Sequence, residues 1–307
     1  MSFGYKSILV PLYGKMIELS VVDFASAMTR QMQAEATVLY LSRILRPIAE
    51  DPKRRYLSMV DKGDLSKAMA LLDDIYQTEL QKDADETRLI VAEKFKFNNV
   101  QERSPKSQIL VDTMGYCWEQ DIVLQADTSQ LLFNKALVSD VVVTNASSIE
   151  AGWQRDVLML VVRDSGRPII VVPTEQVSYQ QMPRKILIAW KQSVHTVRAI
   201  AGAMPLLRTA NSVLVLEIQE GEQFKGERVS ASDVSRWLSK HGIVSQAVSR
   251  NSLGSKAENI LDEEISDFAA DALVMGSYSR SRIREIIFGG FTQHVLNNIR
   301  IPTLLAH

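Results

Sequence analysis

The sequence predicts an α/β protein made of two tandem, doubly wound domains, each with a parallel sheet. Short apolar runs typical of buried parallel strands alternate with segments of helical periodicity. The alternation starts again near residue 184, where KILIAW at 185–190 parallels KSILVP at 6–11. Each series closes on a strand introduced by proline, RPIIVV at 167–172 and RIPTLL at 300–305. These repeats predict one strand-and-helix unit that occurs twice.

The first unit is expected to span residues 1–175. Its periodicity predicts strands at 7–12, 36–41, about 117–123, 140–144 and 169–172, and helices at 21–33, 127–138 and 155–164. A charged, proline-containing segment at 47–63 is expected to be a surface excursion. The long helical pattern at 65–95 is either two helices or one that stands off the domain. We therefore expect an insertion at about 47–107 in this unit.

The second unit is expected to span residues 184–307, after a linker at 173–183 (PTEQVSYQQMP). Its periodicity predicts strands at 185–190, 212–218, 243–249, 272–275 and 303–305, and helices at 197–207, 232–241 and 255–269.

Length and composition restrict the class of protein. The chain has 307 residues, 46% of them hydrophobic and 23% charged, which suits an ordinary globular protein of about two domains. A formal net charge of −1 argues against a general nucleic-acid binder. The sequence shows neither a membrane-spanning run nor a signal peptide, and Cys117 is its only cysteine. We therefore expect a cytoplasmic protein in which Cys117 is a small buried hydrophobe rather than a reactive thiol.

The segment 272–295 carries the candidate site. The apolar run 272–275 ends at Gly276, and a polar, basic loop leads to Gly289 and Gly290. Phe291 and Val295 then fall one helical turn apart, so a helix is expected to begin at or just after the glycine pair. The free N–H groups and positive dipole end of such a helix can hold a phosphate. In the alternative interpretation, the glycines serve only the turn.

The spacing adds to this interpretation. The loop contains Gly276, two residues, Ser279, nine residues, and then Gly289 and Gly290. This spacing resembles the G-x-x-G, nine residues, G-(S/T) nucleotide loop of the universal stress protein family. Ser279 stands where that pattern has its second glycine. Gly290 stands where it has Ser or Thr, although Thr292 could offer a hydroxyl one turn away. The resemblance implies that these loop amides wrap the phosphates of ATP or AMP, with Mg²⁺ possible alongside.

The whole chain resembles a tandem universal stress protein, strongly over the second half and more weakly over the first. The resemblance implies an adenine nucleotide alpha hydrolase-like fold for each half. It also implies that the halves pack as an intramolecular pseudo-dimer, through edge strands at 169–172 and 303–305, with a homodimer of the tandem chain as a further possibility.

The end of each unit's first strand matters because ligands bind outside the carboxyl ends of parallel strands. Nucleotide-binding members of the family have an Asp there, but this chain has Tyr13-Gly14 in one unit and Trp190-Lys191-Gln192-Ser193 in the other. The usual ribose clamp is therefore absent. Lys191 could pair with a phosphate and Trp190 could stack on a base or simply belong to the core. Ser193 completes this group of candidates.

The first unit offers no backbone cradle. Its fourth strand ends in TNASS at 144–148, without a glycine pair, so this degenerate half is not expected to bind nucleotide.

In the second unit Arg280, Arg282 and Arg284 alternate along the loop. They form either an anion clamp or a solvated loop partly neutralised by Glu285. Phe291 and Thr292, at the start of the following helix, complete the candidate nucleotide-binding set.

The sequence assigns no catalytic reaction. The four histidines lack metal-ligand spacing, and His294 is expected to lie on a helix surface or to pack there. No nucleophile elbow, Walker lysine or paired carboxylates appear, so any ATP hydrolysis would be slow.

The leading hypothesis is a stress-response protein whose second domain binds ATP, another adenine nucleotide or a phosphate ligand. One alternative is a scaffold that acts through protein contacts, with 65–95 as a candidate surface. Another is a binder of a different anionic small molecule.

Overall fold

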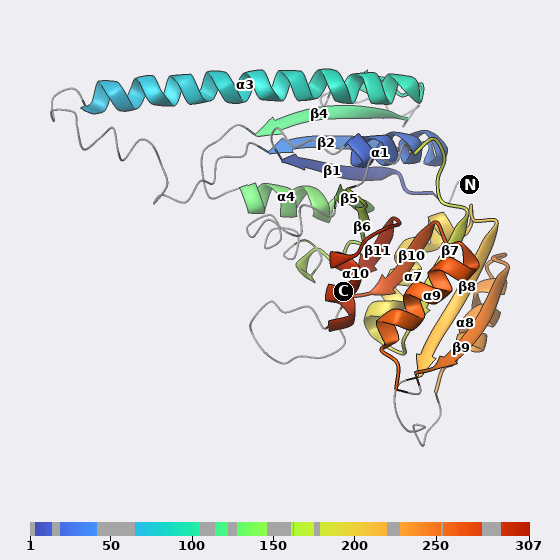
Figure 1. Cartoon of the computed structure of the whole chain (residues 1–307). Coiled ribbons are helices and arrows are strands. Elements are labelled where there is room, and N and C mark those ends of the chain that lie inside the picture. Colours follow the sequence, from blue (N-terminus) through green and yellow to red (C-terminus); the bar gives the residue numbers. More distant parts are fainter. Residues whose placement is uncertain are drawn as a thin grey trace.

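A computed structural model gives the fold of the chain (Figure 1). It describes residues 4–13, 19–41, 65–104, 114–121, 128–145, 161, 163–174, 179–219, 228–252, 254–277 and 290–307. For residues 65–77, 121, 128 and 129 it describes the backbone alone.

The described elements follow the predicted alternation of strands and helices. The first half contains strands β1 (Ser7–Tyr13), β2 (Glu35–Leu41), β3 (Glu102–Arg103), β4 (Gly115–Asp121), β5 (Val141–Asn145) and β6 (Ile169–Val172), and helices α1 (Leu19–Met32), α3 (Leu65–Phe97) and α4 (Thr128–Leu137). The second half contains strands β7 (Lys185–Trp190), β8 (Ser212–Gln219), β9 (Ser245–Asn251), β10 (Ala272–Gly276) and β11 (Thr303–Ala306), and helices α7 (Val194–Leu207), α8 (Ala231–Ser239), α9 (Ala257–Phe268) and α10 (Gly290–Asn297).

The described strands form one 11-stranded sheet in the order β3-β4-β2-β1-β5-β6-β11-β10-β7-β8-β9. Pairing is parallel within each half and antiparallel between β6 and β11, where Leu304 lies opposite Ile170. The order β4-β2-β1-β5-β6 recurs as β9-β8-β7-β10-β11 on the other side of this junction. The tandem α/β prediction and the predicted contact between the two edge strands are confirmed. The domain boundaries at 175 and 184 stay a prediction.

The antiparallel junction decides where the two halves can bind ligands. Because the strand direction reverses between β6 and β11, the carboxyl ends of the two sets of parallel strands lie at opposite edges of the sheet. Candidate sites of the two halves are therefore separated by the length of the strands.

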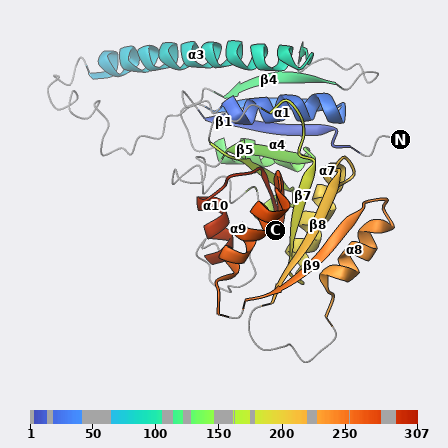
Figure 2. The same ribbon diagram turned by 45° about the vertical axis from the view of Figure 1, so that its right-hand side comes forward.

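The apolar residues of the strands alternate between the two faces of the sheet. Ile8 and Ile188 belong to the core on the face covered by α1, α3, α7 and α8. Leu9 and Leu187 belong to the core on the opposite face, which α4, α9 and α10 cover. Figure 2 shows helices on both sides of the sheet. This arrangement is the doubly wound one that the sequence predicts.

The segment 65–97 is a single helix, α3, which settles the choice between one helix and two. It follows β2 and precedes β4, as α8 lies between β8 and β9, and it runs alongside β4 (Figure 1). Ala84, Val91 and Phe95 bury its inner face in the core, where Tyr40 of β2 also donates a hydrogen bond to Asp83. The C-terminal part of the helix therefore packs on the domain, whereas its N-terminal part extends past the end of β4 (Figure 1).

The structure resolves one ambiguous stretch of the first half and corrects one expectation. The polar stretch 98–106 is ambiguous in the sequence, and it contains β3 at 102–103, which pairs with β4. β4 spans 115–121 rather than 117–123, because it pairs residue by residue with β2, from Gly115 opposite Glu35 to Asp121 opposite Leu41. The predicted excursion at 47–63 and most of the predicted helix at 155–164 lie outside the described residues.

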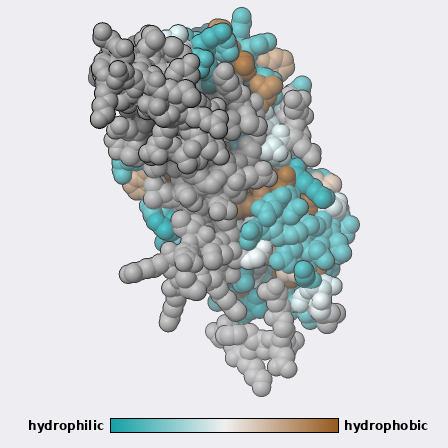
Figure 3. Space-filling model, turned by 60° about the vertical axis from the view of Figure 1, so that its left-hand side comes forward, coloured by the Kyte–Doolittle hydropathy of each residue, from teal (hydrophilic) through white to brown (hydrophobic). Residues whose placement is uncertain are grey.

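Cys117 is buried in β4, as expected. Burial, and secondarily the charge of Glu35, raises the pKa of its thiol to about 11, so the thiolate is disfavoured at neutral pH. Among the described helices, none is long and apolar enough to cross a membrane. The face in Figure 3 accordingly shows mainly hydrophilic side chains over the coloured region, with small separate hydrophobic patches.

A side-chain hydrogen bond joins the two halves, and a group of side chains of the second half lies beside the junction. The Tyr5 hydroxyl donates a 2.6 Å hydrogen bond to the Gly202 carbonyl of α7. Beyond the end of β11, the ring of His307 stacks on that of His195, with centroids 4.3 Å apart and an interplanar angle of 27°. Arg198 donates a 2.9 Å hydrogen bond to the His307 carbonyl. A cluster of titratable groups thus lies beside the junction.

The surroundings of the two histidines lower the pKa of both rings and so favour their neutral forms. Burial, followed by the charges of His307 and Arg198, lowers the pKa of His195. The pKa of His307 is also lowered, first by burial and then by the charge of Arg198, to which the charge of Arg163 adds. A hydrogen bond with the Arg163 backbone and, separately, the charge of Asp164 raise the pKa and oppose part of that shift. Nδ1 of His195 is buried and has no hydrogen-bond partner among the described residues. Protonation would place two positive rings in contact.

We expect the protein to lose stability as the pH falls below about 6.5. Both pKa values are lower in the folded protein, so the unfolded chain takes up protons first and gains relative stability. Urea unfolding followed between about pH 7.5 and 5.5 measures the effect. The double variant His195→Gln with His307→Gln should show a shallower pH dependence, with His241→Gln as the matched control. A double variant with the parent's pH dependence would contradict this expectation.

Candidate functional site

The candidate site lies at the carboxyl ends of β7 and β10, where the strand order of the second half reverses. The chain leaves β7 into α7 on one face of the sheet, and α10, which follows β10, lies on the other. The crevice between these two connections is the position at which open α/β sheets bind ligands.

Gly276, the last residue of β10, lies directly against the first turn of α7. A Cβ built at this position would be 2.6 Å from the backbone nitrogen of Thr196 and 2.8 Å from the carbonyl carbon of His195. Ser277 follows, fully buried, and both its backbone nitrogen and its hydroxyl donate to the Ala306 carbonyl, at 2.8 and 2.9 Å. Gly276 is therefore required by packing, whatever else it does.

We expect Gly276→Ala to lower the free energy of unfolding by about 1–3 kcal/mol, because backbone atoms of α7 must shift to admit the methyl group. Gly290→Ala is the matched control, since a Cβ there meets no atom of the described residues within 4 Å. The control should change the free energy of unfolding by less than about 1 kcal/mol. Urea unfolding without ligand measures both, and equal stability of the two variants would refute the packing argument.

Helix α10 begins at Gly290, which confirms the helix expected after the glycine pair. It ends at Asn297, shortly before β11 starts, so it runs from the carboxyl edge of the sheet back toward the amino edge. Thr292 is 5% exposed, and Phe291 and Val295 pack into the core below. The first amides of α10 consequently lie at the edge where β7 and β10 end.

Four predicted site residues, Ser279, Arg280, Arg282 and Gly289, lie outside the described residues, as does Arg284. The described candidates fall into two groups at one edge of the sheet. Trp190 ends β7, and Lys191 and Ser193 follow it, close to Gly276 at the end of the paired strand β10. Gly290, Phe291 and Thr292 form the first turn of α10.

Trp190, the last residue of β7, and Ser193, which follows the strand, have structural partners within the protein. Trp190 is 7% exposed, and its indole nitrogen donates a 2.9 Å hydrogen bond to the Val229 carbonyl. Lys191 is exposed. Ser193 is the N-cap of α7, and its hydroxyl oxygen accepts a 3.1 Å hydrogen bond from the Thr196 nitrogen. Roles in ligand binding stay predictions for these residues, while the cap and the core contact are observed.

We expect Ser193→Ala to lower the free energy of unfolding by about 1 kcal/mol in the absence of any ligand, because the Thr196 N–H loses its acceptor. Ser193→Asp should retain most of the stability, since Asp is an equally good N-cap. Thermal or urea unfolding distinguishes the two variants. An alanine variant as stable as the parent would show that the cap contributes nothing.

Sequence reasoning missed Glu217, a carboxylate near the carboxyl end of β8 that is only 1% exposed. Its side chain forms an ion pair with Arg228 at 3.2 Å and accepts hydrogen bonds from the Ala231 nitrogen and the Ser249 hydroxyl, both at 3.3 Å. The signal was present as the one charged residue in the otherwise apolar run of SVLVLEIQ at 212–219.

The remaining candidates have simple packing roles. His294 points toward α9, with its Nε2 atom 3.2 Å from a carboxylate oxygen of Asp262. Tyr13, at the end of β1 in the first half, is buried, and burial raises the pKa of its phenol. The described residues contain no group of three or more His, Cys, Asp or Glu side chains able to hold a metal ion.

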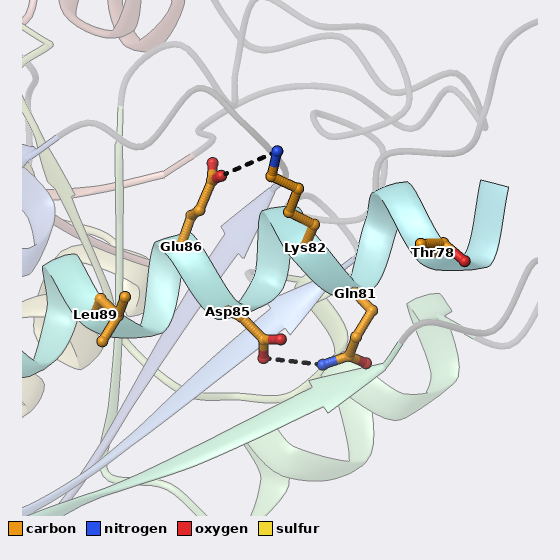
Figure 4. A pocket seen from close by; sticks show the side chains of 6 residues that line it. All are labelled: Thr78, Gln81, Lys82, Asp85, Glu86 and Leu89. Carbon is orange, nitrogen blue, oxygen red and sulfur yellow. Dashed lines mark hydrogen bonds and ion pairs between the residues drawn. The ribbon is translucent and has the colours of Figure 1, made fainter. Parts of the chain in front are cut away.

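An open groove lies along α3, lined by one face of the helix (Figure 4). Its residues are Thr78, Gln81, Lys82, Asp85, Glu86 and Leu89. Lys82 pairs with Glu86 at 3.9 Å, and Gln81 donates a 2.9 Å hydrogen bond to Asp85. Since these polar groups pair with one another and lie in the first half, we assign no ligand to this groove.

Comparison with known proteins bears on the second half most directly. The model of the universal stress protein family matches residues 182–307. No curated protein matches the chain.

Similar solved structures span the whole chain. One is a universal stress protein from Archaeoglobus fulgidus DSM 4304, with a TM-score of 0.63 and 13% identity, covering 98% of this chain and 95% of that one. Another is a functionally unknown protein from Pseudomonas aeruginosa PAO1, with a TM-score of 0.54 and 12% identity, covering 98% of this chain and 92% of that one. At such identities the likeness shows the fold alone.

Proposed function

We propose that the second half, which the model of the universal stress protein family matches at residues 182–307, binds a phosphate-bearing ligand, with ATP or another adenine nucleotide as the leading candidate. The ligand's phosphates lie at the carboxyl edge of the second half, against the first turn of α10 and the loop that leads into it.

The observation that carries the proposal is the start of α10 at Gly290, at the edge where β7 and β10 end. A Cβ at Gly290 would meet no atom of the described residues within 4 Å, so none of them covers the first residue of the helix on that side. The free N–H groups of a helix N-terminus favour a negative group in such a space. The family-like spacing of Gly276, Ser279, Gly289 and Gly290 supports the same ligand.

The chain's departures from the family pattern shape the proposal. The first strand of the second half has no Asp after Trp190, so a carboxylate does not hold the ribose from that position. Affinity then depends on the phosphates, on Arg280 and Arg282 as an anion clamp, and on Mg²⁺ accompanying a triphosphate. ATP should consequently bind more tightly than AMP. Any hydrolysis is slow, because the sequence provides no recognisable general base.

A scaffold role is the second candidate, and one observation favours it. Leu89 and Phe97 of α3 are 72% and 70% exposed, on a helix of the half that is not expected to bind nucleotide. This role needs no ligand at the second-half site.

Calorimetric titration of the full chain with Mg-ATP, AMP and inorganic phosphate tests the proposal. We expect measurable ATP binding that weakens more than about tenfold in Gly289→Val, because a side chain there obstructs the backbone cradle. Ala247→Val, at an exposed position of the edge strand β9, is a control that also introduces a valine and should bind as the parent does. Absence of heat with all three ligands would remove the nucleotide proposal and leave the scaffold role.

A further inference from the structure

Helix α7 carries apolar residues on two opposite faces. Ala199 and Ala203 belong to the buried face that packs on the sheet. On the outer face, Val194 and Val197 are 62% and 55% exposed, and Ala201 is exposed as well. Steps of three and four residues place these outer side chains in one stripe along the helix. Because a helix that is apolar on both faces is normally covered on both, the outer face of α7 lacks a cover among the described residues.

The first half shows such a cover on the equivalent helix. α1 and α7 each follow the first strand of their half, and each has 14 residues. Val22, Asp23 and Ser26, the fourth, fifth and eighth residues of α1, are all buried. On this face Lys94 of α3 pairs with Asp23 at 3.0 Å, and the Asn98 side chain donates a hydrogen bond to the Ser26 hydroxyl. The outer face of α1 therefore receives a second helix.

The same positions of α7 are uncovered. Its fourth, fifth and eighth residues are Val197, Arg198 and Ala201, and all three are exposed. In the second half α8 takes the place of α3 in the order of elements, but it has 9 residues instead of 33. The second half thus has the surface that receives a helix in the first half, and the described residues place no helix on it.

The charge of this face is the reverse of that in α1. Where α1 has Asp23, which meets Lys94, α7 has Arg198, and α7 contains no acidic residue. Nη1 of Arg198 donates a 2.9 Å hydrogen bond to the His307 carbonyl, which holds the guanidinium beside the apolar stripe. Arg208, at the C-cap of α7, is exposed and adds positive charge. A second copy of α7 would bring like charges together, so the charge favours a partner that carries a carboxylate.

We infer that the outer face of α7, formed by Val194, Val197, Arg198 and Ala201, binds an amphipathic helix of a partner protein that carries an acidic residue opposite Arg198. The apolar stripe supplies the buried area, and the ion pair fixes how the two helices align. The contact repeats the packing of α3 on α1 with the charges exchanged. It needs no ligand at the carboxyl edge, so it is independent of the proposed function.

Peptides copied from α3 provide a test. Residues 84–98 include the α3 face that covers α1, and a hydrocarbon staple on the opposite side keeps so short a helix folded. One peptide has the natural Lys94 and the other carries Lys94→Glu. In a fluorescence anisotropy titration with the full chain, we expect the Lys94→Glu peptide to bind about tenfold more tightly, because its carboxylate meets Arg198.

Variants of the full chain locate the binding face. Arg198→Glu should reverse the preference between the two peptides, because the natural lysine then meets a carboxylate. Val197→Glu should weaken binding of the Lys94→Glu peptide more than about tenfold, because it places a charge in the apolar stripe. Val244→Glu is the matched control and should bind as the parent does, since Val244 is 83% exposed and lies outside α7. Both valines are exposed, so both variants should remain folded, which thermal unfolding checks.

Several outcomes would overturn the inference. One is no binding by either peptide, and another is equal binding by both peptides to the parent and to Arg198→Glu. A dimer in sedimentation velocity that Val197→Glu dissociates and Val244→Glu leaves intact would assign the face to a second copy of the chain. Binding to vesicles of anionic phospholipid that is lost in Val197→Glu and kept in Val244→Glu would assign it to a membrane surface.

Discussion

The antiparallel pairing of β6 with β11 is the interaction on which the rest of the structure depends. Each half would otherwise end in a short, apolar strand with one unpaired side, which is an unfavourable edge in water. Pairing Thr303–Ala306 with Ile169–Val172 joins two parallel sheets into one and continues both apolar cores across the junction. It also sends the carboxyl ends of the two halves to opposite edges, so the halves cannot share one ligand crevice.

A short series of contacts connects the same junction to the start of the proposed phosphate loop. The carbonyl at the end of β11, that of Ala306, holds Ser277, where the loop after β10 begins. His307 follows Ala306 and stacks on His195 in the first turn of α7, which in turn packs on Gly276. Proton uptake by the histidine pair therefore adds positive charge next to Gly276 and Ser277, the residues at which the loop begins.

The two halves share a strand order but differ in how they close it. In the first half the long helix α3 takes the place that the short α8 takes in the second. In the second half the carboxyl edge combines a strand that ends in glycine, a helix that begins with glycine, and a buried carboxylate, Glu217, that pairs with Arg228. The same strand order thus occurs with two different carboxyl edges. The proposed phosphate site lies at the carboxyl edge of the second half.

The sequence by itself determined the tandem α/β architecture, the strands of the second half to within a few residues, and the helix after the glycine pair. These follow from period-2 and period-3.6 patterns and from proline and glycine positions, which are local properties of the chain. Tertiary structure alone decided β3 and the limits of β4, because pairing with neighbouring strands set them. It also decided that Gly276 is required by contact with α7, that Trp190 is buried, and that Glu217 pairs with Arg228, since each depends on which distant residues meet at the carboxyl edge.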